Sequence, residues 1–377
     1  MCPDDTPIVF ADSGKQLLFI GIRDKVLTQD EAEFIITNNI GGIVLFARNI
    51  ESPEQVHALC TQIQALRHKT RDKLPFLIAV DQEGGRVARL RAPFTEWPPL
   101  AAIGKLDSTS VAFRFAMSMG LELRAVGINL DFAPCVDVFS NPKNTVIGDR
   151  SLSSDPEVVA KLASALVRGY IKSGVIPCAK HFPGHGHTLV DSHEELPVEP
   201  SDLEQLRAVN LVPFKKVFRA RLDMVMTAHI KFPKIDPEWP VTLSEKFIRG
   251  MARDEMRFRN IIITDDLDMK ALANHYKVDE IPVRALQAGC DMLLYCNKFD
   301  VPPIAIEALR KAARDHKISA QQIDESYNRV LALKKEMLTN PDPLPYEAAS
   351  TLIGHPDHKR LSAAIKDGAV PADLLVT

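Results

Sequence analysis

The chain of 377 residues is predicted to be an α/β protein, a single (β/α)8 TIM-type barrel with a C-terminal helical strap. Eight short apolar runs recur along it, and segments with helical periodicity separate them. Each run is nearly continuous in apolar residues, whereas a strand with one solvent-facing side would alternate. Continuous runs are typical of parallel strands covered by helices, and right-handed crossovers most simply close eight of them into a barrel.

The strands can be assigned in chain order from these runs. We expect them at Lys15–Ile22, Gly42–Phe46, Phe76–Asp81, Ile128–Pro134, Val175–His181, Met224–Ile230, Asn260–Asp265 and Asp291–Cys296. Helices are expected between them, among others at Ala112–Val126, Ser244–Met256 and Pro302–Ala313. An open doubly wound sheet is the alternative, but no G-x-G-x-x-G motif follows the first run.

Capping residues mark further helices. Ser52 and Asp155 each precede a proline at the first helical position, where a backbone N–H is not needed. Ser319, followed three residues later by Gln322, predicts a capping box. The segment Ser201–Ala220 also has helical spacing, but Pro213 within it predicts a break or a kink.

The barrel is expected to end near residue 340. Three prolines between positions 341 and 345 should terminate its last helix, and a final helix is expected near Asp357–Ile365. Residues 1–340 are therefore predicted to form the catalytic domain, and residues 341–377 a tail packed on or trailing from it.

Bulk properties exclude several classes of protein. A hydrophobic fraction of 46%, a charged fraction of 25% and a formal net charge of -3 are typical of a globular protein with a large core. No Lys/Arg run suggests a nucleic-acid partner, and no apolar stretch approaches the ~18 residues that would suggest a membrane partner. The six cysteines form no CxxC pair, and the acidic N-terminus does not resemble a signal peptide, so we expect a cytoplasmic protein.

Polar side chains cluster at the carboxyl ends of several predicted strands. The segment from Asp81 to Arg89 begins at the end of the third strand, and His229 lies at the end of the sixth. The fifth leads into a loop that contains four histidines, and Gly184 and Gly186 are expected to make this loop flexible. Because the carboxyl ends of barrel strands meet at one mouth, these groups predict a shared active site.

A mouth lined by carboxylates, Lys, Arg and His suits a sugar, because hydroxyl groups need several hydrogen bonds. Asp265 ends an Ile-Ile-Ile run and is the predicted nucleophile, whereas Asp266 and Asp268 are expected to cap the next helix. Asp191, two residues before His193, is expected to raise the pKa of that imidazole, so that it can protonate a leaving oxygen.

Four motifs of the chain together resemble glycoside hydrolase family 3. They are Lys180-His181-Phe182-Pro183-Gly184-His185-Gly186, Asp191-Ser192-His193, Asp81-Gln82-Glu83-Gly84-Gly85-Arg86-Val87 and Ile263-Thr264-Asp265-Asp266-Leu267-Asp268-Met269. The resemblance is to its bacterial β-N-acetylhexosaminidases, which recycle peptidoglycan fragments. It implies a covalent intermediate on Asp265 with retention of configuration, and acid/base catalysis by His193 supported by Asp191. It further implies a monomer without cofactor or metal, and a site in which the N-acetylglucosamine hydroxyls are bound by Asp81, Arg89, Arg150, Lys180 and His181. His185 is expected to shape the loop, whereas no role is expected for His187, which could be exposed to solvent.

Other readings of the same residues remain open. His185 and His187 with Asp265 could hold zinc in a metal-dependent barrel hydrolase. The 2-acetamido oxygen of the substrate could replace the enzyme nucleophile, with Asp265 and Asp266 assisting. A histidine acid/base also tolerates an incoming phosphate, as in a glycoside phosphorylase. A sugar-binding barrel without activity would not need the Asp191/His193 pair.

Overall fold

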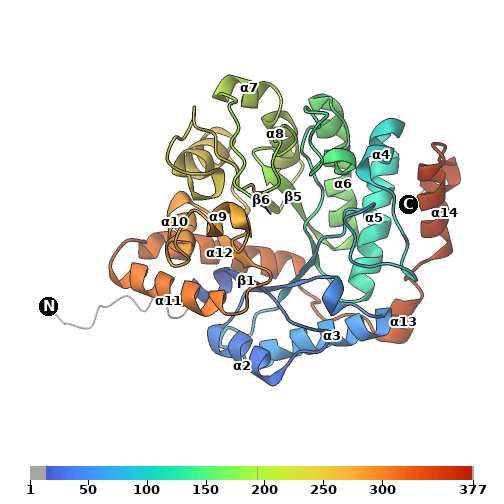
Figure 1. Cartoon of the computed structure of the whole chain (residues 1–377). Coiled ribbons are helices and arrows are strands. Elements are labelled where there is room, and N and C mark those ends of the chain that lie inside the picture. Colours follow the sequence, from blue (N-terminus) through green and yellow to red (C-terminus); the bar gives the residue numbers. More distant parts are fainter. Residues whose placement is uncertain (1–13, 193, 376–377) are drawn as a thin grey trace.

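The computed structural model describes residues 14–192 and 194–375, and it contains a closed barrel of eight parallel strands (Figure 1). The strands are β1 (Leu18–Gly21), β2 (Gly42–Leu45), β3 (Leu77–Val80), β4 (Leu130–Asp131), β5 (Ile176–Phe182), β6 (Met224–Thr227), β7 (Ile261–Asp266) and β8 (Met292–Tyr295). Each strand pairs with the next in sequence, and β8 pairs with β1 to close the ring. The barrel prediction is confirmed, and the open sheet is excluded.

Helices surround the barrel (Figure 1). The α-helices are α2 (Gln29–Asn38), α3 (Pro53–Ala65), α4 (Leu100–Leu106), α5 (Thr109–Ala125), α6 (Pro156–Ser173), α7 (Leu203–Ala208), α8 (Leu211–Arg219), α9 (Lys270–Ala273), α10 (Glu280–Ala288), α11 (Val301–Arg314), α12 (Ala320–Met337), α13 (Tyr346–Ser350) and α14 (Pro356–Lys366). Shorter or irregular helices are η1 (Gly14–Leu17), η2 (Ala47–Asn49), η3 (Leu66–Lys69), η4 (Gly148–Arg150), η5 (Val241–Leu243), the π-helix η6 (Lys246–Glu255) and η7 (Ala372–Leu375).

The strands are buried, as their continuous apolar runs predict. Every strand residue is buried except Asp265, which is half-buried. The fourth strand is much shorter than predicted, and side-chain bonds of Asn129 add to the pairing at its amino end. Asn129 accepts from the Ile78 backbone N–H at 2.8 Å and donates to the Phe76 carbonyl at 3.0 Å.

Most helix signals in the sequence act as predicted. The side chains of Ser52, Asp155 and Ser319 each accept a backbone N–H in the first turn of their helix. Gln322, expected to complete a capping box with Ser319, instead donates its side-chain amide to the carbonyl of Leu286 and joins α12 to α10. The predicted break occurs between α7 and α8, which places the proline in the first turn of the second helix.

The C-terminal strap packs on one side of the barrel, where α13 contacts α3 and α5, and α14 contacts α4 and α5 (Figure 1). Buried Glu122 of α5 anchors it, with Oε1 lying 2.8 Å from Nδ1 of His358 on α14. Oε2 of the same carboxylate accepts the backbone N–H groups of Gly354, in the strap, at 3.2 Å and of Thr95 at 2.9 Å. Because Thr95 belongs to the loop between β3 and α4, one carboxylate ties the strap to that loop.

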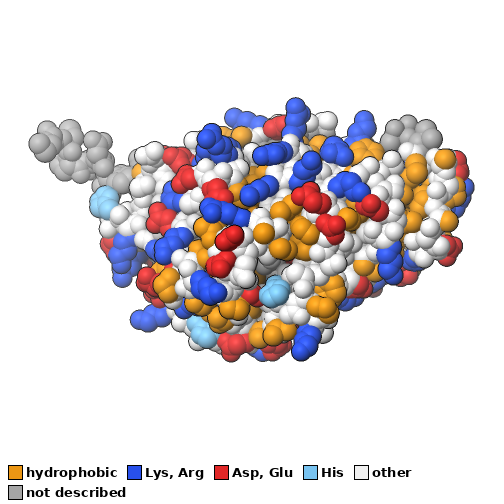
Figure 2. All heavy atoms as spheres, turned by 90° about the horizontal axis from the view of Figure 1, so that it is seen from above, with side chains coloured by type: hydrophobic (Ala, Val, Ile, Leu, Met, Phe, Trp, Pro, Cys, Tyr) orange, Lys and Arg blue, Asp and Glu red, His pale blue; other side chains and the backbone are white. Residues whose placement is uncertain are grey.

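One face of the molecule carries charges of both signs. On the face drawn in Figure 2, Lys and Arg side chains lie among Asp and Glu side chains, which agrees with the small formal net charge of -3. Within residues 14–192 and 194–375, no helix has the length and the apolar character that crossing a bilayer requires.

Candidate active site

An ion network at the carboxyl ends of β3 and β5 forms the floor of the barrel mouth. The Lys180 ammonium lies 2.7 Å from Asp81 Oδ1 and 2.7 Å from Glu83 Oε1. Burial by itself would lower the pKa of Lys180, but these two carboxylates hold it above its ordinary value. An ammonium group has three protons, so beyond these two described partners one proton can serve a ligand hydroxyl.

Two arginines complete this network. Arg150 forms a bidentate pair with Glu83, with Nε–Oε2 at 2.9 Å and Nη2–Oε1 at 2.8 Å, while Arg89 Nη2 lies 3.3 Å from Asp81 Oδ2. Burial raises the pKa of both carboxyl groups, but the surrounding cations outweigh it and hold both values below the ordinary range. Both acids are therefore ionised, with lone pairs remaining for substrate hydroxyls.

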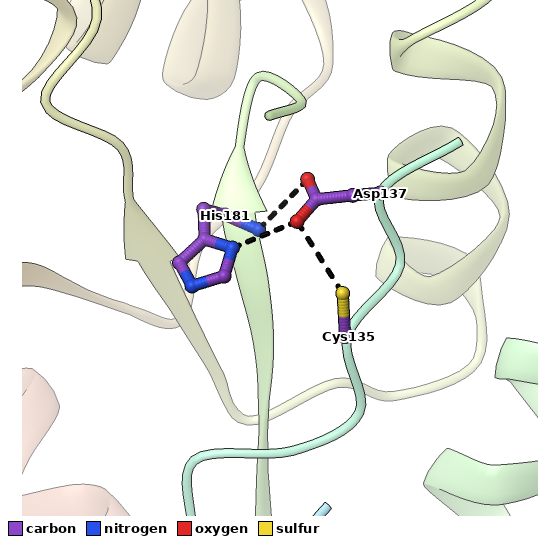
Figure 3. Close-up of side chains that lie close together, drawn as sticks. All are labelled: Cys135, Asp137 and His181. Atoms are coloured by element: carbon purple, nitrogen blue, oxygen red, sulfur yellow. Dashed lines mark hydrogen bonds and ion pairs between the residues drawn. The ribbon is translucent and has the colours of Figure 1, made fainter. Parts of the chain in front are cut away.

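The segment after β4 positions His181. The backbone N–H of Val136 donates to the Lys180 carbonyl at 2.8 Å, which places the next residue, Asp137, against β5. Its Oδ2 lies 2.7 Å from His181 Nδ1 (Figure 3). Burial raises the pKa of Asp137, but the His181 ring outweighs it and sets the pKa to about 2. Nδ1 of His181 is directed at this carboxylate, so Nε2 is the ring nitrogen left for a ligand.

His185 holds the loop after β5 together. Its Nδ1 lies 2.7 Å from Thr188 Oγ1 and its Nε2 lies 3.2 Å from Ser192 Oγ. Burial and, next, the neighbouring His181 lower its pKa to about 4, so the ring is neutral at pH 7. These contacts fit the expected loop-shaping role, and His187 is exposed.

The glycines of this loop serve close packing, which differs from the flexibility that we expected. A Cβ on Gly186 would lie 1.8 Å from the Val138 carbonyl oxygen, and one on Gly184 would lie 2.6 Å from the side chain of Asn210. Both glycines are buried, so the backbone can approach its neighbours only where no side chain intervenes.

The metal ligands considered from the sequence do not form a group in the described part of the chain. Both ring nitrogens of His185 bind hydroxyl groups, and His187 is exposed. A different group, Cys135, Asp137 and His181, is arranged so that all its ligand atoms lie within 4.8 Å of one another.

Asp265 lies inside the same mouth. It is the one half-buried strand residue, and its Oδ1 accepts the backbone N–H of Asp266 at 2.8 Å. Its charge acts on Cys178 and His185, which lie across the mouth in and after β5, and on Cys296, which follows β8. The predicted nucleophile therefore faces the ring of polar groups from the β7 side.

The prediction that Asp266 and Asp268 cap the following helix is wrong. Helix α9 begins after Met269 without a side-chain cap. Asp266 Oδ1 accepts the backbone N–H of Cys296 at 3.1 Å, and Asp268 Oδ2 accepts that of Lys298 at 3.1 Å. Burial and, next, the charge of Asp268 raise the pKa of Asp266 to about 7. These carboxyl groups hold the segment after β8 against β7.

His229 supports the backbone beside the predicted nucleophile. The ring is fully buried, and its Nε2 lies 2.9 Å from the Asp266 carbonyl oxygen. Its Nδ1 lies 2.8 Å from Thr242 Oγ1, so both ring nitrogens are engaged. The sequence places His229 at a strand end but does not reveal this contact.

The loop that carries the predicted acid/base pair docks on the segment after β7. Three contacts join them: Ala271 N to Ser192 O at 3.3 Å, Lys270 Nζ to Glu194 Oε2 at 3.0 Å, and His275 Nε2 to Glu195 Oε1 at 2.5 Å. Asp191 is half-buried at the start of this docked stretch. His193 lies outside the described residues.

The structure thus brings together Asp81, Arg89, Arg150, Lys180 and His181, with Asp265 and the docked loop at the same mouth. Glu83, Asp137 and His229 were not assigned from the sequence. Glu83 lies in the same motif as Asp81, which could have drawn attention to it. Asp137 has no comparable local signal, because its partner is His181, 44 residues away.

A profile of the Glycosyl hydrolase family 3 N terminal domain matches residues 10–333. The chain belongs to glycosyl hydrolase family 3.

This family 3 chain is 40% identical over 302 residues to the Beta-hexosaminidase of Stenotrophomonas maltophilia strain K279a, in a match that covers 78% of the chain and 86% of that protein. It is 33% identical over 366 residues to the Beta-hexosaminidase A of Pseudoalteromonas piscicida, with 91% of the chain but 61% of that longer protein covered. The solved structure of NagZ from Neisseria gonorrhoeae in complex with N-trifluoroacetyl-D-glucosamine matches with a TM-score of 0.77 and 31% identity, over 94% of this chain and 98% of that one. The resemblance to bacterial beta-hexosaminidases predicted from the sequence is confirmed.

Proposed function

We propose that this family 3 protein is a retaining exo-β-N-acetylglucosaminidase that removes terminal non-reducing N-acetylglucosamine from peptidoglycan-derived muropeptides, such as GlcNAc-1,6-anhydroMurNAc with or without its peptide. The observation that carries the proposal is one shared mouth. Asp265, the docked loop that begins with Asp191, and the network around Lys180 all lie at the carboxyl ends of the strands.

Asp265 is proposed to attack the anomeric carbon. Its strand is buried on both sides, and His229 contacts the carbonyl oxygen of the next residue, Asp266. The backbone at Asp265 is therefore held in place, which fixes the direction of its carboxylate. The bond from the anomeric carbon to the leaving oxygen breaks as the bond to Asp265 forms, which yields a covalent glycosyl-enzyme.

His193 is proposed to donate a proton to the leaving oxygen and then to accept one from the incoming water. Asp191 would orient this imidazole and stabilise its charged form. The docking of Ser192 and Glu194 onto the segment after β7 supports the assignment, because that segment follows the strand that contains Asp265.

The ion network is proposed to bind the sugar hydroxyls. Asp81 and Lys180 hold each other in place and still offer acceptor and donor sites, so a hydroxyl can be bound with little rearrangement. Arg89 extends this row through its contact with Asp81, and His181 offers Nε2 as an acceptor. Arg150 is engaged with Glu83, so its part in binding is exerted largely through that carboxylate.

The setting of the reaction is also part of the proposal. Five described cysteines are free and buried, as is usual in a reducing compartment, and we place the enzyme in the cytoplasm as a monomer. Residues 1–340 would form the catalytic domain, with residues 341–377 as its strap.

The test compares hydrolysis of a chromogenic β-N-acetylglucosaminide with that of the matching β-glucoside. The first should be the strongly preferred substrate. Asp265→Ala and His193→Ala should each lower kcat/KM by about 10³-fold or more, whereas Asp315→Ala, at an exposed position, should not change it. Equal cleavage of both glycosides, or an Asp265→Ala variant that is only mildly slowed, would refute the proposal.

Two further arms separate the alternative mechanisms. A fluorinated sugar that becomes trapped on Asp265 would support the covalent route over assistance by the 2-acetamido group. The products formed with and without inorganic phosphate distinguish hydrolysis, which yields free N-acetylglucosamine, from phosphorolysis, which yields its 1-phosphate.

A further inference from the structure

We propose that Cys135, Asp137 and His181 form a binding site for a zinc ion beside the substrate pocket. Asp137 Oδ2 lies 3.3 Å from Cys135 Sγ and 2.7 Å from His181 Nδ1. Figure 3 shows the thiol and the ring directed at this one carboxylate from the segment after β4 and from β5. A thiolate, an imidazole and a carboxylate are ligands that zinc prefers, and three protein ligands leave a fourth position for water.

The surroundings hold this group ready for a cation. Asp137 Oδ1 accepts the backbone N–H groups of His181 at 3.1 Å and of His185 at 2.7 Å, so the carboxylate is fixed without the use of Oδ2. Two hydrogens, one on the thiol and one on the ring, now converge on Oδ2. Around a zinc ion with bonds of about 2.0–2.3 Å, tetrahedral ligand atoms lie about 3.3–3.5 Å apart. Oδ2 and Nδ1 would therefore have to separate by about half an ångström, and all three ligand atoms already lie within 4.8 Å of one another.

A metal ion would enter from the barrel mouth, past His181. Cys135 and Asp137 are fully buried, whereas the His181 side chain is 10% exposed and reaches the mouth. The nearby cations Arg150 and Lys180 are already paired with carboxylates, Arg150 with Glu83 and Lys180 with both Glu83 and Asp81.

Binding would change the ring that faces the sugar. The thiol proton of Cys135 leaves to solvent, and a His181 ring that binds zinc through Nδ1 carries its one proton on Nε2. Nε2 then donates a hydrogen bond and no longer accepts one from a substrate hydroxyl. Zinc is therefore expected to inhibit hydrolysis. This effect rests on the proposed role of His181, whereas the binding of zinc does not.

The experiment first measures binding on the full-length protein. Zinc bound after equilibrium dialysis is counted by mass spectrometry, and cobalt serves as an optical probe because a thiolate ligand adds a charge-transfer band. Wild type and Cys60→Ser, which alters another buried free thiol, should each bind one zinc and show the band. Cys135→Ser should bind zinc at least about tenfold more weakly and lack the band.

X-ray absorption of the zinc-loaded wild type tests the site without any substitution, and one sulfur ligand at about 2.3 Å is expected. Zinc without a sulfur ligand, or equal zinc binding by wild type and Cys135→Ser, overturns the proposal. Inhibition that is equally strong in both proteins overturns the expected inhibition through this site, because the inhibitory metal then acts elsewhere, for example at Asp191 and His193. Zinc binding through Cys135 without inhibition upholds the site and counts against the proposed role of His181 in substrate binding.

Discussion

Two buried lysines at opposite ends of the barrel have opposite electrostatic surroundings. Lys180, near the carboxyl end of β5, has a side chain that is 3% exposed, and Lys334 of α12, at the amino end, is 1% exposed. Lys180 contacts the carboxylates of Asp81 and Glu83. Lys334 contacts neutral oxygens, among them Oε1 of Gln16 at 2.6 Å.

Burial lowers the pKa of an ammonium group in both places, and the partners decide the outcome. The carboxylates outweigh burial at Lys180 and raise its pKa, whereas burial prevails at Lys334 and lowers its pKa to about 7. A lasting charge at the mouth suits the binding of a polar ligand. A lysine that can lose its proton suits the other end, where it only has to join α12 to the barrel.

The largest effect is expected from a substitution of Lys180, at the barrel mouth. Lys180→Met removes the cation between Asp81 and Glu83, so kcat/KM should fall by about 10³-fold and the free energy of unfolding by about 3–5 kcal/mol. Steady-state kinetics and urea unfolding measure the two quantities. Lys334→Met is the matched control and should keep kcat/KM within about threefold of wild type. Similar losses of activity in both variants would contradict the claim that only Lys180 takes part in substrate binding.

The second prediction concerns Lys334, at the amino end of the barrel, and the pH dependence of the free energy of unfolding. Between about pH 7 and pH 10, unfolded Lys334 keeps its proton because its ordinary pKa is near 10.5, whereas the folded lysine has lost it. The unfolded state then binds more protons, so the free energy of unfolding should rise with pH, by up to a few kcal/mol from this group. Urea unfolding across this range should show the rise in wild type and in Lys335→Met, an exposed neighbour. In Lys334→Met this contribution should be absent, and an unchanged slope would disprove the assignment.

The smallest effect is expected at buried Glu122, which lies at neither end of the barrel. Glu122 joins the strap to the loop that contains Thr95 and Arg89. Glu122→Gln should shift this loop and raise KM by about three- to tenfold, with kcat changed by less than about twofold. Glu347→Gln, at an exposed position of α13, is the control and should behave as wild type. A lower melting temperature with unchanged KM would show that the strap contributes stability alone.

The order of the barrel was readable from the sequence because burial on both sides demands continuous apolar runs, and the Ile-Ile-Ile run before Asp265 is the clearest of them. The polar groups at the strand ends were readable for a related reason, since parallel strands bring their carboxyl ends to one mouth. Helix starts were local signals, and Ser52 and Asp155 acted as predicted. Membership of the family followed from long motifs in the right order, which the comparisons confirmed.

Partners, by contrast, were decided by the tertiary structure alone. Lys180 meets Asp81 across 99 residues of sequence, and His181 meets Asp137 across 44. Asp266 could equally have capped a helix, and its bond to Cys296, 30 residues away, could not be inferred from its neighbours. A carboxylate after a strand has the same local chemistry whichever group it binds. Only the closed ring, which places β3, β5 and β7 around one mouth and β8 beside β7, selects the group that each carboxylate reaches.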